Sequence, residues 1–482
     1  MTEGYDLIVA GAGPAGANAA IAAVEQGLSV ALIDEADAAG GQVYRRPRVA
    51  REARGAGAEA GWRGHDGAAG EELRLRLARS GVVFHASRRI ASVSGRFRVD
   101  VVGPRGHDAL EAPYLIAATG AYERVIPFPG WTTPGVTGLA AATILIESEG
   151  MLPGRRVAVV GLGPLLAAVA ARIVESGGEV AVVADLASRS DWVKAAWRLT
   201  AERPMLIDGW AWLKVIRRAR IPVLHRTGVR RVEGERSVRR LVVGPVGADG
   251  APVPGPHAAF DVDAVVVGHG LVPSGDIPRL LGADLRHDPA GGGWCTLVDG
   301  EGRTTLRGLY AVGDGARIAG ARLAPLTGRL AGLAVAREIG MISAERFATL
   351  AGDTQAEIAR LRPVAAAMAR LMILKPGLVD GITGGTIVCR CEDIPRSEID
   401  KAIDEGALSL NALKHFTRCG MGPCQGRMCG ESVAELLARR SGRSRESLGI
   451  WTPRPPLRPI AIDELIGTFS YADIPIPPPS AL

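Results

Sequence analysis

The sequence predicts an α/β protein of two dinucleotide-binding-like domains followed by a small, helical, cysteine-rich domain. Two segments, residues 5–35 and 155–185, each pass from an apolar strand through a glycine turn into an alanine-rich helix and back to a second apolar strand. Such units build parallel sheets covered by helices. Near the other end, five of the six cysteines lie between Cys389 and Cys429. With 482 residues, 47% of them hydrophobic, the chain can bury about three cores.

The first unit contains the glycine pattern of a dinucleotide-binding turn. A strand at 7–10 leads into three glycines, and the chain returns as a strand at 30–33 that ends in two acids. The first glycine allows a tight turn, the second lets a pyrophosphate approach the backbone, and the third lets helix and strand pack closely. In a chain with 63 glycines the pattern alone could arise by chance, but the full order of elements favours a real site. The candidate residues are Gly11, Gly13, Pro14, Ala15 and Gly16, with Asp34 or Glu35 as the ribose acceptor, the spacing favouring Asp34.

Three further segments indicate that the dinucleotide is FAD. The segment GLYAVGDGA resembles a motif of two-domain flavoprotein reductases of the glutathione-reductase type, in which the aspartate binds the ribityl chain. AATGAYER resembles the crossing between the two domains of that family, and GGQ resembles its loop beside the cofactor. Each alone could be a glycine turn between strands, but together and in this order they predict FAD. The residues concerned are Gly41, Gln42, Thr119, Gly120, Gly313 and Asp314. A helix expected at 325–339 would direct its positive end at the flavin.

The second unit is an imperfect copy of the first. Gly161 and Gly163 are present, but Leu166 stands where the third glycine is expected, so a branched side chain would separate helix and strand. Asp185, after the second strand, could still hold a ribose. We therefore expect the fold of a dinucleotide domain, and leave open whether it binds NAD(P) or another adenine nucleotide.

The cysteine-rich segment predicts a metal-thiolate centre. Cys389 and Cys391 form a C-x-C step, 32 residues separate it from Cys424, and Cys424 and Cys429 form a C-x4-C step. The pattern, with GMGPCQGRMC at its end, resembles [2Fe-2S] domains of the bacterioferritin-associated-ferredoxin type, which implies these four cysteines as ligands. We expect Cys419 to be a buried bystander thiol. We also expect a capping box at 397–400 to open a short helix.

Two alternatives apply to the cysteines. A structural zinc site uses the same soft ligands and stays open. A disulfide framework is disfavoured because the cysteine density is low and the first residues carry acids but no lysine or arginine, which does not resemble a secretory signal. We therefore expect a cytoplasmic location, with peripheral attachment to a membrane left open.

Composition and missing motifs exclude several functions. No C-x-x-C pair occurs in the sequence, which argues against disulfide exchange. The net charge of +6 is modest and aromatic residues make up only 4%, so nucleic-acid binding is not expected. The longest apolar stretch, residues 157–171, is interrupted by a GLGP turn and does not predict a membrane span. No catalytic base can be identified.

The order of these segments predicts a discontinuous first domain. We expect an FAD-binding domain at 1–122 and 303–345, a second dinucleotide-binding-like domain at 123–302 between them, a helical connector at 346–383, a [2Fe-2S]-binding domain at 384–440 and a proline-rich tail at 441–482. Residues 51–72, rich in glycine and alanine, are expected to form a loop.

Almost the whole chain resembles the larger flavoprotein subunit of heteromeric amine and amino-acid dehydrogenases. That group comprises opine oxidase A subunits, proline and hydroxyproline dehydrogenase alpha subunits and hydrogen cyanide synthase B subunits. The resemblance implies an oxidase-like beta subunit with its own flavin and the substrate site, and leaves room for a further small subunit. This chain would forward electrons through FAD and a [2Fe-2S] cluster. The substrate and the final acceptor stay open, as do two alternatives: a self-contained NAD(P)H-dependent ferredoxin or nitrite-type reductase, and a flavoprotein with a structural zinc module.

Overall fold

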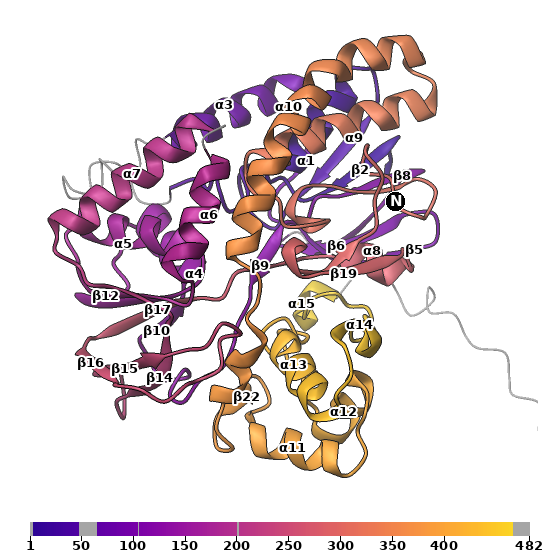
Figure 1. Cartoon of the computed structure of the whole chain (residues 1–482). Helices are drawn as coiled ribbons and strands as arrows, with labels where there is room; N and C mark the ends of the chain where they lie inside the picture. The colour runs from indigo at the N-terminus through magenta and orange to yellow at the C-terminus, as the bar shows by residue number, and fades with distance from the viewer. Residues whose placement is uncertain (1–2, 48–64, 105, 200–201, 466–482) are drawn as a thin grey trace, which may run out of the picture.

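The first sheet of the structure is assembled from two separated stretches of the chain. The structure is a computed structural model that describes residues 3–47, 65–104, 106–199 and 202–465 (Figure 1). The sheet has five parallel strands in the order β21-β8-β2-β3-β4. They are β2 (Leu7–Ala10), β3 (Val30–Ile33), β4 (Val83–His85), β8 (Tyr114–Ala117) and β21 (Leu309–Ala311). Since β21 follows the entire second sheet in sequence, the chain of the second sheet is inserted between β8 and β21 of the first.

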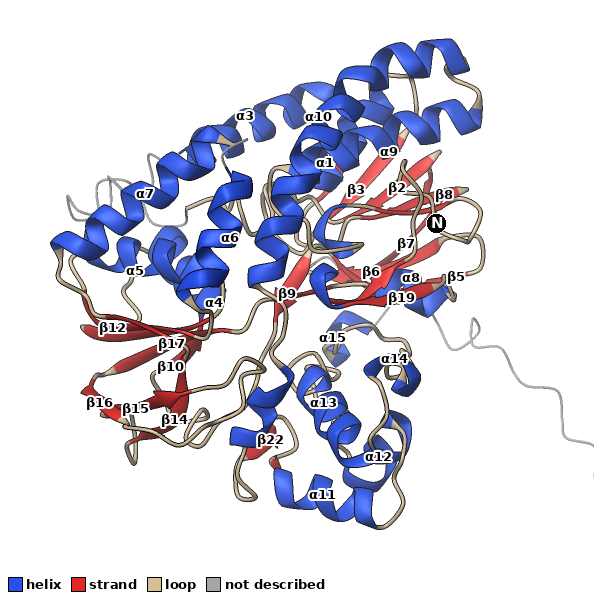
Figure 2. Ribbon diagram, in the orientation of Figure 1, coloured by secondary structure: helices blue, strands red, loops and turns tan. Residues whose placement is uncertain are grey.

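Both faces of this sheet are covered, which explains why its strands are continuous apolar runs (Figure 2). Leu7 and Val9 face one core with the helices, whereas Ile8 and Ala10 face a second core beneath a smaller sheet. The helices are α1 (Pro14–Val24), α3 (His65–Ser80) and α9 (Leu323–Ile339). The smaller sheet contains β1 (Glu3–Gly4), β5 (Arg89–Ser94), β6 (Arg98–Gly103) and β7 (Gly106–Glu111).

Small residues let α1 and α9 touch backbone to backbone. A Cβ atom on Gly328 would lie 1.9 Å from the carbonyl oxygen of Ala15, and one on Gly332 would lie 2.3 Å from that of Ala19. Any larger side chain at either glycine would force the helices apart. The first turn of α9 is thereby held beside the glycine turn that precedes α1.

The second sheet repeats the parallel arrangement in the order β10-β17-β11-β12-β13. Its strands are β10 (Val136–Gly138), β11 (Arg156–Gly161), β12 (Glu179–Asp185), β13 (Val223–His225) and β17 (Ala264–Gly268). Its helices are α4 (Leu139–Glu149), α5 (Leu165–Glu175), α6 (Arg189–Leu199) and α7 (Arg203–Arg218), and a small antiparallel sheet contains β14 (Thr227–Glu233), β15 (Arg240–Pro245) and β16 (Ala258–Asp261). The chain crosses between the two large sheets at β9 (Ala121–Glu123) and β18 (Leu271–Pro273), which pair antiparallel. Next along the chain come α8 (Asp276–Leu281), β19 (Leu285–Asp288) and β20 (Gly293–Thr296).

A long helix connects this body to the C-terminal part of the chain. Helix α10 (Ala344–Leu371) packs on both α9 and α6 (Figure 1). The buried carboxylate of Glu202 pairs with Arg322, which precedes α9, and with Arg360 on α10. The loop predicted at 51–72 is wrong for residues 65–72, which form the first half of α3. Residues 51–64 lie outside the described residues.

The C-terminal part is helical and surrounds the cysteines. It contains β22 (Ile387–Cys389), β23 (Ile394–Pro395), α11 (Arg396–Asp404), α12 (Leu410–Thr417), α13 (Gly430–Ser441), α14 (Arg445–Leu448) and α15 (Ile462–Leu465). The predicted capping box at 397–400 is wrong, because α11 already begins at Arg396 after Pro395, with no side-chain cap. Trp451 packs against Gly420 and Gly426, where any Cβ would collide with the indole ring. The tail therefore helps to close the cysteine-rich domain; residues 466–482 lie outside the described residues.

Candidate functional site

Three segments far apart in sequence meet around the first glycine turn. A Cβ atom on Gly41 would lie 2.9 Å from Cα of Gly13, and one on Gly313 would lie 2.8 Å from Cβ of Ala15. A Cβ on Gly315 would lie 2.9 Å from Oγ1 of Thr119. Gly13 itself is open, since its nearest neighbour would be 3.8 Å from such an atom. The predicted GGQ, ATG and GD segments are thus brought together at the N-terminus of α1, where a pyrophosphate binds in dinucleotide folds.

The turn residues are held in place by specific backbone geometry. Gly11 has φ +103°, and a Cβ there would lie 2.4 Å from the carbonyl oxygen of Ala118, so no other residue fits. A Cβ on Gly16 would lie 1.8 Å from the carbonyl oxygen of Gly11. Thr119 donates to the carbonyl oxygen of Ser274 at 2.6 Å, and this bond ties the ATG crossing to the strand that returns from the second sheet.

Asp314 presents one carboxylate oxygen to its own loop. Oδ1 accepts hydrogen bonds from the N–H groups of Ala319 and Gly320, both at 2.8 Å. Oδ2 accepts none from the described part of the chain. Burial raises the pKa of Asp314, and the two N–H groups oppose this shift. Thr327 accepts the N–H of Gly313 at 3.2 Å and so fixes the start of the loop against α9. The geometry fits a carboxylate that orders its loop and offers its second oxygen to a ribityl hydroxyl.

The two acids after β3 play different parts. The carboxylate of Asp34 accepts the N–H of Ala12 at 2.6 Å and that of Ala36 at 2.8 Å, so it braces the glycine turn. Burial raises its pKa, opposed by these two bonds. Glu35 is exposed beside it. Spacing along the chain did not predict this bracing role, and both acids stay candidate ribose acceptors. Gln42 is also exposed, and its side-chain oxygen accepts from Arg45 at 2.8 Å.

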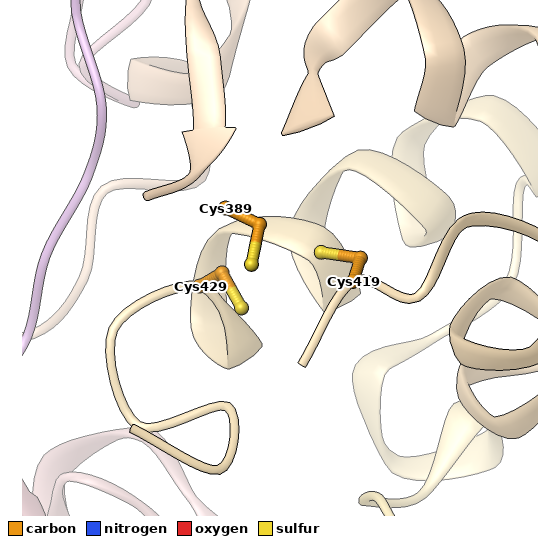
Figure 3. A group of neighbouring side chains, drawn as sticks. All are labelled: Cys389, Cys419 and Cys429. Atoms are coloured by element: carbon orange, nitrogen blue, oxygen red, sulfur yellow. The ribbon is translucent and has the colours of Figure 1, made fainter. Parts of the chain in front are cut away.

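The five C-terminal cysteines form an inner and an outer group. The sulfur atoms of Cys389, Cys419 and Cys429 all lie within 4.8 Å of one another, and all three residues are buried (Figure 3). Cys391 and Cys424 are half-buried, and the thiol of Cys391 interacts with the thiol and backbone N–H of Cys424. Three converging soft donors with a further pair close by fit a thiolate-bound metal centre. Cys419 is buried as expected, but it lies within the donor set rather than apart from it.

The inner thiols polarise one another strongly. Hydrogen bonds from Cys419 and Cys429 lower the pKa of Cys389 to about 2. The same bonds raise the pKa of Cys419 and Cys429, since each donates its proton toward the Cys389 sulfur. A thiolate, the form that binds metal, is therefore already favoured at Cys389.

A buried ion pair joins the crossing between the two large sheets to the cysteine-rich domain. Arg124 follows the ATG crossing and strand β9, and its Nε lies 3.5 Å from the carboxylate of Glu431, two residues after Cys429. The guanidinium also donates to the carbonyl oxygens of Gly292, at 2.7 Å, and His269. Burial raises the pKa of Glu431, but Arg445 and Arg124 outweigh it and hold that pKa below its ordinary value. Sequence patterns missed this pair, although its arginine stands in the quoted AATGAYER segment.

The corresponding crevice of the second sheet is covered by its own chain. A Cβ on Gly163 would lie 2.9 Å from Cγ of Met372, which follows α10. Leu378 packs on Leu162 and Leu186. The carboxylate of Asp185 is engaged, accepting Nε1–H of Trp192 at 2.5 Å and the N–H of Ala187 at 2.8 Å.

Leu166 and His269 also lie at the second sheet. Leu166 is buried between α5 and the sheet. A small pocket lies between Gly161, Leu378 and His269. His269 is buried, and desolvation lowers its pKa to about 4, so its ring is neutral at physiological pH.

The fold and these sites define a class of protein. A family model described as pyridine nucleotide-disulphide oxidoreductase matches residues 5–340, and one described as sarcosine oxidase A3 domain matches residues 383–468. The chain belongs to the pyridine nucleotide-disulphide oxidoreductase family and is an FAD-dependent oxidoreductase. Among the described residues, no helix combines the length and apolarity needed to cross a bilayer.

Within that class, the chain is similar to flavoprotein subunits of multi-subunit oxidases over nearly its whole length. It is 33% identical to an opine oxidase subunit from Rhizobium meliloti strain 1021, covering 96% of this chain and 98% of the relative. It is 29% identical to hydrogen cyanide synthase subunit HcnB of Pseudomonas protegens, covering 94% and 96%. The predicted membership of this group is confirmed.

Solved structures agree on the fold. L-proline dehydrogenase from P. horikoshii matches with a TM-score of 0.68 at 21% identity, covering 97% of this chain and 81% of that one. Thioredoxin reductase of T. acidophilum matches with a TM-score of 0.50 at 19% identity, covering 70% and 99%. These likenesses concern the fold alone.

Proposed function

We propose that this chain is the electron-transfer flavoprotein subunit of a heteromeric FAD-dependent amine or amino-acid dehydrogenase. A partner subunit resembling an oxidase, with its own flavin and the substrate site, would oxidise an opine, proline, hydroxyproline or glycine-type amine. The FAD of this chain would take up the electron pair, and a [2Fe-2S] cluster would accept electrons from it singly. Two observations support the proposal: the relatives are named as subunits of opine oxidase and hydrogen cyanide synthase, and three buried cysteines converge in the C-terminal domain with two more close by.

The buried ion pair between Arg124 and Glu431 is the main structural observation behind this proposal. Arg124 lies four residues after Gly120, at the predicted flavin side, and Glu431 lies two residues after Cys429, at the predicted cluster side. The arginine side chain is 1% exposed, so both charges are held in place by burial as well as by attraction. A buried contact between the two proposed redox sites would keep their separation constant. We infer that this contact sets the distance over which electrons pass.

The proposed ligands follow the resemblance of the cysteine pattern. Cys389, Cys391, Cys424 and Cys429 would hold the cluster, and the turn residues from Gly11 to Gly16, with Thr119, Gly120, Gly313 and Asp314, would hold FAD. Zinc would use the same thiols, and the presence of acid-labile sulfide distinguishes the two metals.

The covered crevice of the second sheet argues against the NAD(P)H-dependent reductase. A nicotinamide dinucleotide would need the space over Gly163, where Met372 packs, and a free ribose acceptor, whereas Asp185 is engaged by Trp192. Access would require Met372 and the chain that follows it to move away. We therefore propose that electrons enter from the partner subunit.

The experiment is purification of the chain from its native host, anaerobically and with an affinity tag. We expect a second flavoprotein subunit to copurify, and dye reduction by an amine panel to appear with the complex but not with the isolated chain. Amine oxidation by the isolated chain, or rapid NADH-dependent dye reduction by it, would contradict the proposal.

A further inference from the structure

The cluster site contains more thiols than a [2Fe-2S] centre needs. Such a centre takes four cysteine ligands, two on each iron. The outer pair, Cys391 and Cys424, supplies two of them from one side. The inner group, Cys389, Cys419 and Cys429, supplies three sulfurs for the two remaining positions (Figure 3). The surplus therefore lies on the inner side.

Each inner cysteine is placed by a different element. Cys389 ends β22, Cys429 precedes the first residue of α13, and Cys419 stands in the turn after α12. That turn is fixed: Arg418 adopts φ +61°, and the N–H of Cys419 donates to Oγ1 of Thr417 at 3.1 Å. Cys419 is fully buried, and its sulfur lies within 4.8 Å of the other two inner sulfur atoms. No rearrangement of a loop is needed to bring it near the other two sulfurs.

We propose that Cys419 is a reserve ligand of the inner iron, able to take the position of either Cys389 or Cys429. This inference rests on the proposed function, since it presupposes the cluster. In the exchange, the Fe–S bond to one cysteine breaks and the Fe–S bond to Cys419 forms. The proton of the Cys419 thiol passes to the departing thiolate, so charge balances and no electron is transferred. The outer pair has no such reserve among the described residues.

The test compares alanine variants, because alanine cannot ligate metal as serine can. The full chain would be purified anaerobically as C429A, C389A, C424A and C419A, and as the double variants C429A/C419A and C389A/C419A. Iron and acid-labile sulfide per FAD would be measured, together with the electron-spin-resonance spectrum after dithionite reduction. FAD content and the unfolding temperature report whether each variant is folded.

We expect single variants of the inner cysteines to keep more iron than a variant of the outer pair. The wild type and C419A should hold about two irons and about two sulfides per FAD. C429A and C389A should each keep at least about half of this with a changed resonance spectrum, whereas C424A and both double variants should lose nearly all. If either C429A or C389A proves too unstable to purify, the other decides the question. A folded single inner variant as iron-poor as its double variant would overturn the inference while leaving the cluster intact in the wild type. A wild type without labile sulfide would instead overturn the proposed function.

Discussion

Replacing Asp314 with asparagine should weaken FAD binding without lowering the stability of the flavin-free protein. Oδ1 of Asp314 accepts two backbone N–H groups at 2.8 Å, and asparagine keeps an oxygen for that purpose. The other carboxylate oxygen becomes an NH₂ group and can no longer accept a ribityl hydroxyl. A hydrogen bond to a charged group contributes about 1.5 to 3 kcal/mol. The dissociation constant for FAD should therefore rise about 10- to 150-fold.

The assay is titration of FAD into the stripped protein, followed by flavin fluorescence, with Asp314→Ala as the comparison. Alanine leaves both N–H groups without an acceptor, at a cost of about 1 to 3 kcal/mol each, so it should also lower the unfolding temperature of the flavin-free protein. Asparagine should leave that temperature nearly unchanged. If Asp314→Asn bound FAD as tightly as the wild type, the assignment of this carboxylate to the flavin would be refuted.

Three further changes follow from packing and charge. Arg124→Gln should destabilise the chain by about 1 to 3 kcal/mol, because Glu431 keeps Arg445 as a partner but the buried carbonyl oxygens of Gly292 and His269 lose their charged donor. Arg418→Gln, in an exposed pair, should cost less than about 1 kcal/mol. Urea unfolding compares the two variants, and equal midpoints would contradict the buried link. Leu166→Gly should lower the free energy of unfolding by about 3 to 6 kcal/mol in the same assay, because it removes a buried side chain from a helix. It should not enable NADH to reduce the flavin. A gain of rapid reduction by NADH would show that only this side chain blocks the crevice. Gly328→Val should lower FAD content and the unfolding temperature, because its side chain would collide with α1. Gly352→Ala, which has open space around it, should raise the unfolding temperature slightly. No difference between the two variants would contradict the close contact of α1 with α9.

Much of the first sheet could be predicted from local sequence. Strands at 7–10 and 30–33 have the predicted bounds, and α9 begins only two residues before the predicted 325. These elements were predictable because buried parallel strands are uninterrupted apolar runs and because glycine marks each turn. The same signal failed for the start of α3, whose alanines and glycines suggest a loop, although Leu73 and Leu77 further along the helix are buried in one core with α1.

Contacts between distant segments could not be predicted. The pairing of Arg124 with Glu431 and the packing of Met372 on Gly163 depend on how the C-terminal part folds back over both sheets. No periodicity within either segment encodes such contacts. Spacing also did not indicate that the sulfur of Cys419 lies near those of Cys389 and Cys429, since counting residues between cysteines measures distance along the chain and not the convergence of three elements in space.

The most direct test of the account is a stopped-flow experiment on the anaerobic chain. The chain would be mixed either with NADH or with an amine together with the partner subunit that oxidises it, while flavin bleaching is followed and samples are frozen for electron-spin resonance. The account predicts rapid flavin bleaching and a reduced [2Fe-2S] signal with the partner and amine, and slow or no bleaching with NADH. Rapid bleaching by NADH alone, or flavin reduction by the partner with no cluster signal, would contradict it.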